Sequence, residues 1–188
     1  MIRVIILDCF GVLAESGWGL IDDTYKPTKE QWDEMSAVSH ACDRGIISIA
    51  ELVQAFADVL DVGPGEINQV IGSQRKNYPL LQLIEQLKDK GYTIAMLSNV
   101  GSGFMNDYFT EKELLLFDHM FLSSDLGMTK PDPEIYEHCI KALDVSANEC
   151  LFIDDNATNV YAAEAEGIHG HVYNDLDTLV SRLADFDI

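Results

Sequence analysis

The sequence predicts an α/β fold: a Rossmann-like, three-layer core with a parallel sheet, and a small helical cap inserted after the first strand. Three runs of consecutive apolar residues are typical of strands buried on both faces of such a sheet, namely residues 4–7, 93–97 and 150–153. Helical patterns separate the later runs, and an alternation of strand and helix favours a doubly wound core. Residues 14–79 break this alternation, because they carry only helical signals.

Weaker apolar runs at residues 119–122 and 169–173 predict two further strands. The helical patterns of the core cover residues 80–90, 133–143, 157–166 and 175–183. Gly91 and Gly167 follow two of these patterns, as glycines commonly do at helix C-termini. The core is therefore expected to contain five strands with helices between them.

The insertion shows its own helix signals. Thr28 with Gln31, and Ser48 with Glu51, have the spacing of capping boxes. Apolar residues then recur on one helical face between 49 and 60, and a further helix is expected over residues 66–76. We therefore divide the chain into a core of residues 1–13 and 80–188 and a cap of residues 14–79.

The composition restricts the classes of partner. The 188 residues are 47% hydrophobic, enough for one folded core, and 32 acidic residues oppose 12 basic ones. This negative surface would repel nucleic acid and anionic membranes. The first apolar run is too short for a signal or membrane-spanning segment, and the four cysteines are scattered, so we expect reduced thiols and a cytoplasmic location. A monomer or homodimer is expected.

Polar residues follow the three strongest strands. Asp8 ends the first run, Ser98 and Asn99 the second, and Asp154 and Asp155 the third. The carboxyl ends of parallel strands meet at one edge of the sheet, where ligands of open α/β sheets bind. Converging carboxylates repel one another unless a cation intervenes, and oxygen ligands favour Mg²⁺. The sequence thus predicts a magnesium site at this edge.

Four segments in order resemble the motifs of the haloacid dehalogenase superfamily, in its branch with a helical cap. They are Ile5 to Leu13, Met96 to Asn99, Gly127 to Pro133, and Phe152 to Val160. Within that superfamily the chain resembles sugar phosphatases, such as α-glucose-1-phosphatase, and the phosphatase domain of epoxide hydrolase. The resemblance covers nearly the whole chain and implies a hydrolase of a small phosphorylated metabolite.

The resemblance also implies a role for each motif residue. Asp8 would be the nucleophile that forms an aspartyl-phosphate. Ser98, Asn99 and Lys130 would hold the phosphoryl oxygens, where charge sits during the transfer. The ligands of Mg²⁺ would be Asp8, the backbone carbonyl of Phe10, and Asp154, with Asp155 close by.

Phe10 departs from the phosphatase pattern, which usually has an aspartate two residues after the nucleophile. That aspartate exchanges a proton with the leaving group, an effect worth typically about 10² to 10⁴-fold. A substrate with a good leaving group, a substituting residue elsewhere, or a slow enzyme would each account for Phe10. Two alternatives remain open: a 2-haloacid dehalogenase, which also lacks this aspartate, and a catalytically weak protein that binds a metal or partner. The retained Asp154 and Asp155 favour the phosphatase.

Several residues have a structural interpretation beside the functional one. Asp155 could cap the helix that begins near Asn156, and Asn159 could serve that helix or the site. Trp18, Tyr25 and Trp32 could line a substrate pocket or simply pack within the cap.

Overall fold

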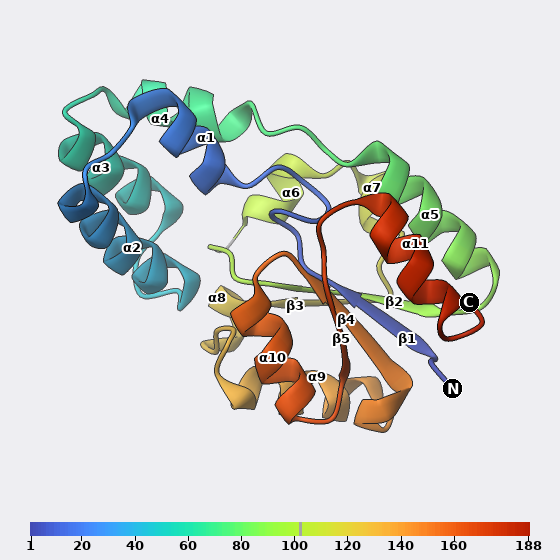
Figure 1. Cartoon of the computed structure of the whole chain (residues 1–188). Coiled ribbons are helices and arrows are strands. Elements are labelled where there is room, and N and C mark those ends of the chain that lie inside the picture. Colours follow the sequence, from blue (N-terminus) through green and yellow to red (C-terminus); the bar gives the residue numbers. More distant parts are fainter. Residues whose placement is uncertain (102) are drawn as a thin grey trace.

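A five-stranded parallel sheet forms the centre of the molecule in the computed structural model, which describes residues 1–101 and 103–188 (Figure 1). Its strands are β1 (Val4–Leu7), β2 (Thr93–Ser98), β3 (His119–Leu122), β4 (Cys150–Asp154) and β5 (His169–Val172), in the spatial order β3-β2-β1-β4-β5. β1 lies in the middle, and its Ile6 is paired with Ala95 on one side and Phe152 on the other. The predicted α/β, Rossmann-like core is confirmed.

Helices cover both faces of the sheet. Those of the core are α5 (Tyr78–Asp89), α6 (Phe104–Tyr108), α7 (Glu111–Leu114), α8 (Ser123–Leu126), α9 (Pro133–Leu143), α10 (Ala157–Ala165) and α11 (Leu176–Ala184), with a short 3₁₀ helix at Ala147–Glu149. Figure 1 shows α5 and α11 on one face and α9 and α10 on the other. The layers are therefore helix, sheet and helix.

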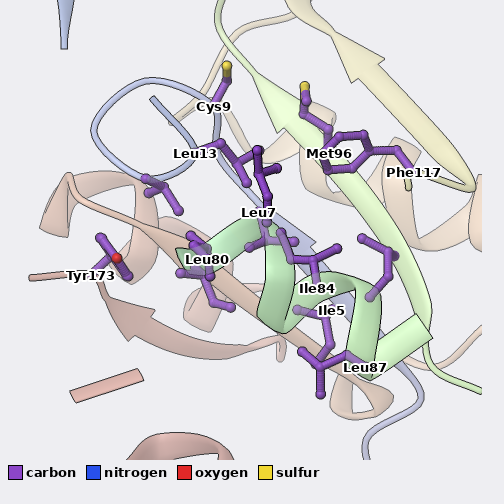
Figure 2. Packing of buried hydrophobic residues seen from close by; sticks show 14 of the residues in the cluster. Ile5, Leu7, Cys9, Leu13, Leu80, Ile84, Leu87, Met96, Phe117 and Tyr173 are labelled. Carbon is purple, nitrogen blue, oxygen red and sulfur yellow. The ribbon is translucent and has the colours of Figure 1, made fainter. Parts of the chain in front are cut away.

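Alternate residues of β1 enter two separate cores, because successive side chains of a strand point to opposite faces. Ile5 and Leu7 pack with residues of α5, such as Leu80 and Ile84 (Figure 2). Ile6, on the other face, packs in the cluster that holds residues of α9 and α10. Burial on both faces explains why these strands are continuous apolar runs.

Between β1 and β2 the chain forms α1 (Gly17–Tyr25), α2 (Lys29–Asp43), α3 (Ile49–Leu60) and α4 (Pro64–Gly72). These helices pack around a hydrophobic cluster of their own, which includes Met35 and Phe56. The capping boxes at Thr28 and Ser48 are both formed, so α2 and α3 begin where their local signals predicted. In Figure 1 the four helices lie together beside one end of the sheet.

Two of the helix boundaries that differ from the expectation have a visible cause. α4 ends at Gly72 rather than near residue 76, because Lys76 forms a β-bridge with Ala14 where the inserted segment returns to the core. α5 begins at Tyr78 rather than at residue 80, since the side chain of Asn77 accepts a hydrogen bond from the Leu80 N–H and caps the helix. Both differences come from long-range pairing or a cap just outside the apolar pattern.

No helix in the described parts of the chain is long and apolar enough to cross a bilayer. All four cysteines are buried free thiols.

Candidate active site

Three carboxylates meet at the carboxyl edge of the sheet. Asp8 directly follows β1, Asp154 is the last residue of β4, and Asp155 follows it. β1 and β4 are hydrogen-bonded neighbours with Leu7 opposite Ile153, so the two strands end side by side. One oxygen of each carboxylate lies within 4.8 Å of the others. The expected convergence of these residues is thus present.

Lys130 lies between two of these carboxylates. Its Nζ is 2.8 Å from Asp8 Oδ1 and 2.6 Å from Asp154 Oδ2, and the residue is only 4% exposed. The side chain of Asn99 fixes the backbone here: its Nδ2 donates to the Lys130 carbonyl, and its Oδ1 accepts from the Lys130 N–H, both at 2.9 Å. Asn99 therefore positions Lys130, a contact that the motif alone did not reveal.

Residues at the start of α10 orient the side chain of Asp154. Asn159 Nδ2 donates to both carboxylate oxygens, at 3.2 and 3.0 Å, and the Asn156 N–H donates to Oδ1 at 2.8 Å. Asn159 therefore serves the site. The N-cap of α10 is Asn156, whose side chain accepts from the Thr158 N–H, so Asp155 does not cap this helix.

The electrostatics of this cluster favour a bound cation. Burial raises the pKa of Asp8 to about 7; the Lys130 ammonium opposes this rise, and the charge of Asp154 adds to it. The pKa of Asp155 is likewise raised, first by burial and then by Asp154. One ammonium cannot neutralise three carboxylates, and carboxylate oxygens are the ligands that Mg²⁺ prefers. The donor set therefore fits a magnesium ion.

Gly11 leaves space for Asp155. A Cβ on Gly11 would overlap the Asp155 carboxylate, and the backbone there has a φ of +86°, which favours glycine. The loop that follows Asp8 can thus pass directly against the Asp155 carboxylate.

Ser98 and Phe10 complete the predicted set. Ser98 ends β2 with a fully buried side chain, and its Oγ has no hydrogen-bond partner among the described residues. Because buried polar groups are normally hydrogen-bonded, this hydroxyl is suited to bind a ligand. The ring of Phe10 instead packs against Phe104 and Tyr108, with centroid distances of 5.3 and 6.4 Å. The Phe10 side chain therefore offers no proton to the site.

A cavity of about 890 Å³ connects this cluster with the inserted helices, and we call it the active-site cavity. Asp8, Lys130 and Asp155 lie in its wall, and Trp18 and Trp32 line it from the inserted helices. The two indole rings stack with a centroid distance of 4.7 Å. Tyr25 is not part of this wall; it packs against the cluster between the inserted helices.

His40 and Asp43 also line the active-site cavity, and sequence reasoning did not single them out. They lie three residues apart on α2, outside any motif. Only the folding of α2 over the sheet edge brings them near the cluster, so the linear sequence carries no signal for them.

Comparison with known proteins gives consistent similarities. A family model described as haloacid dehalogenase-like hydrolase matches residues 2–167. The chain is 31% identical over 193 residues to a sesquiterpene phosphatase of Aspergillus oryzae, which covers 94% of this chain and 92% of the relative. It is 29% identical over 121 residues to bifunctional epoxide hydrolase 2 of Sus scrofa, covering 62% of this chain but 22% of that protein.

Two solved structures share the fold. A HAD family enzyme of Bacteroides thetaiotaomicron, in complex with magnesium and inorganic phosphate, superposes with a TM-score of 0.74 at 21% identity and covers 95% of this chain and 99% of its own. An L-2-haloacid dehalogenase of Xanthobacter autotrophicus superposes with a TM-score of 0.66 at 19% identity, covering 90% and 76%. The fold is thus shared with a HAD family enzyme that binds magnesium and phosphate and with a dehalogenase.

Proposed function

The chain belongs to the haloacid dehalogenase-like hydrolase family, and we propose that it is a magnesium-dependent phosphatase that acts on a small phosphate monoester through Asp8. One observation carries the proposal: oxygens of Asp8, Asp154 and Asp155 lie within 4.8 Å of one another, and the buried ammonium of Lys130 contacts Asp8 and Asp154. This arrangement joins a nucleophile, a set of metal ligands and a cation at one point.

In this proposal Asp8, the backbone carbonyl of Phe10, and Asp154 would hold Mg²⁺, with Asp155 close by. When bound, the metal would neutralise charge on the phosphoryl oxygens and polarise phosphorus. The structural support lies in the excess of carboxylates over ammonium groups, and in Asn159, which fixes both oxygens of Asp154.

The chain's own groups then perform the displacement. Asp8 attacks phosphorus and forms an aspartyl-phosphate, which water later hydrolyses. Lys130, the Asn99 amide and the Ser98 Oγ, which has no partner among the described residues, hold the phosphoryl oxygens. Because this local field supplies the attraction, the net charge of −20 is compatible with an anionic substrate.

We further propose that residues 14–79 act as a cap domain over a core of residues 1–13 and 80–188. The cap would exclude water and select the leaving group. The stacked pair Trp18 and Trp32 in the cavity wall, together with the similarity to a sesquiterpene phosphatase, supports a leaving group with an apolar body. A sugar phosphate, one of the small phosphorylated metabolites that the resemblance to sugar phosphatases allows, receives less support from this wall.

A 2-haloacid dehalogenase is the second candidate, and Phe10 is the observation that favours it. The acidic pair at Asp154 and Asp155 supports the phosphatase, since a carbon–halogen displacement needs no metal. Halide release from a 2-haloacid without metal would establish the rival.

Substitution of the nucleophile tests the proposal. We expect Asp8→Asn to reduce phosphate release from a panel of apolar and sugar phosphate monoesters by at least about 10³-fold, because an amide cannot form the aspartyl-phosphate. Asp89→Asn, an exposed acid at the end of α5, is the matched control and should leave the rate unchanged. Activity retained in Asp8→Asn would contradict the assignment of the nucleophile.

A further inference from the structure

The C-terminal end of α2 packs against the core beside the carboxylate cluster. The Cys42 side chain lies so close to Gly101 that a Cβ on this glycine would be 2.8 Å from Cys42 Sγ. A Cβ on Gly45 would similarly be 2.8 Å from the Ser124 carbonyl oxygen. Residues 42–45, which we call the α2 anchor, therefore touch the core at the ends of β2 and β3.

An ion pair adds a third attachment to the α2 anchor. Arg44 Nη2 lies 2.8 Å from Asp132 Oδ2, and Asp132 is the N-cap of α9, two residues after Lys130. The α2 anchor thus forms an ion pair with the loop that contains Lys130. Asp43 lies between Cys42 and Arg44 and is held at this position by both neighbours.

Asp43 lines the active-site cavity together with Asp8 and Lys130. It is half-buried, and the field of Lys130 reaches its carboxyl. Asp43 thus places a carboxyl from the inserted helices at the cavity where Phe10 supplies none.

Other titratable groups in the described cavity wall are less suited to exchange a proton. Lys76 is paired with Glu113 at 2.7 Å. The Tyr108 hydroxyl donates to the Gln74 carbonyl, and burial raises its pKa to about 12. Burial also raises the pKa of the Cys42 thiol to about 11. Outside the carboxylate cluster this leaves Asp43 and, one turn earlier on α2, the exposed His40.

We propose that Asp43 is the catalytic acid and base that replaces the aspartate missing at Phe10. The inference rests on the proposed function. In the first step a bond forms between Asp8 and phosphorus, the ester bond from phosphorus to the leaving oxygen breaks, and Asp43 gives that oxygen its proton. In the second step water attacks phosphorus, Asp43 takes a proton from this water, and the bond to Asp8 breaks. Asp43 ends protonated, as it began.

The titration of Asp43 is compatible with both steps. Burial raises its pKa to about 6, against opposing effects of His40 and Lys130. A group that titrates near the working pH can both give and accept a proton, which is the condition for general acid–base catalysis.

Two esters that differ in their leaving group test the proposal in Asp43→Asn. For an alkyl phosphate, whose leaving oxygen needs a proton, we expect kcat to fall by about 10² to 10⁴-fold. For p-nitrophenyl phosphate the first step needs no acid, so only hydrolysis of the aspartyl-phosphate is slowed. Rapid mixing should then show a burst of one nitrophenol per enzyme, followed by slow turnover. A thermal melt checks that the variant folds.

Two further variants distinguish proton transfer by Asp43 from proton transfer by a neighbouring group. Phe10→Asp in the Asp43→Asn background puts a carboxyl at the position where the family usually has one, and should restore part of the rate on the alkyl ester. His40→Gln should not produce the leaving-group dependence. A burst in His40→Gln but not in Asp43→Asn would assign proton transfer to His40 and overturn the proposal.

The remaining outcomes are distinct. Unchanged kinetics of Asp43→Asn on both esters, or an equal loss on both without a burst, would overturn the role of Asp43 and leave the proposed phosphatase intact. Wild-type protein that releases phosphate from neither ester would contradict the proposed function itself, and the role of Asp43 with it.

Discussion

At the scale of single residues, Lys130 balances charge in a place with little water. Its ammonium contacts Asp8 and Asp154, and both the lysine and Asp154 are almost fully buried. Taking one partner out of a buried ion pair leaves an uncompensated charge, which costs more than the intact pair contributes. We therefore expect Lys130 to affect stability as well as the binding of the phosphoryl group that we propose.

We expect Lys130→Met to lower the free energy of unfolding by about 3 to 5 kcal/mol in the absence of metal. Mg²⁺ should recover part of this loss, because it supplies positive charge to the same carboxylates. Urea unfolding with and without Mg²⁺ measures both effects. The control is Lys88→Met, which removes a half-exposed pair with Asp118 and should cost less than about 1 kcal/mol. Equal losses in the two variants would contradict this description of the site.

The sequence identified the residues of the cluster but not their supporting contacts. Asp8, Ser98 and Asp154 were predicted because each ends an apolar run, and strand ends of a parallel sheet meet at one edge. Asn99 and Asn159 act through hydrogen bonds to Lys130 and Asp154, and these depend on how loops and helices return to the sheet. Hydrogen bonds of this kind leave no periodic pattern.

At the scale of elements, α2 links the inserted helices to the active site. Its start is fixed locally by the capping box at Thr28, whereas its end is fixed by contacts with the core through the α2 anchor. Local signals therefore predicted where α2 begins, whereas tertiary contacts determine where its C-terminal end lies.

The Arg44–Asp132 pair gives a prediction for this element. Both side chains are about half exposed, so Arg44→Ala should change the free energy of unfolding by less than about 1 kcal/mol. We nevertheless expect kcat on an alkyl phosphate to fall several-fold, because Asp43 loses one of its attachments. Arg3→Ala breaks a comparable exposed pair with Glu149, away from the active-site cavity, and should leave kcat unchanged. The same small effect on kcat in both variants would contradict a positioning role for Arg44.

The boundaries of α4 and α5 show the same division between local and distant causes. The apolar pattern predicted that each helix exists, but the return of Lys76 to Ala14 and the cap at Asn77 decide where the helices end and begin. A β-bridge between residues 62 positions apart cannot be inferred from either segment alone.

At the scale of the whole molecule, the inserted helices pack around their own hydrophobic cluster beside one end of a parallel sheet. The core provides the carboxylates and the lysine, while the inserted helices provide the aromatic wall and, in our inference, the proton-transfer group. The fold class followed from the sequence because doubly buried strands are continuous apolar runs. The residues that line the active-site cavity could not be predicted in the same way, since they come from segments far apart in the chain.

The metal dependence of phosphate release tests the central claim most directly. Wild-type protein is treated with a chelator and assayed for phosphate release from apolar monoesters with and without added Mg²⁺, with halide release from a 2-haloacid measured in parallel. We predict that phosphate release is lost on chelation, returns with Mg²⁺, and is accompanied by no halide release. Metal-independent halide release, or phosphate release that continues unchanged after chelation, would contradict the account.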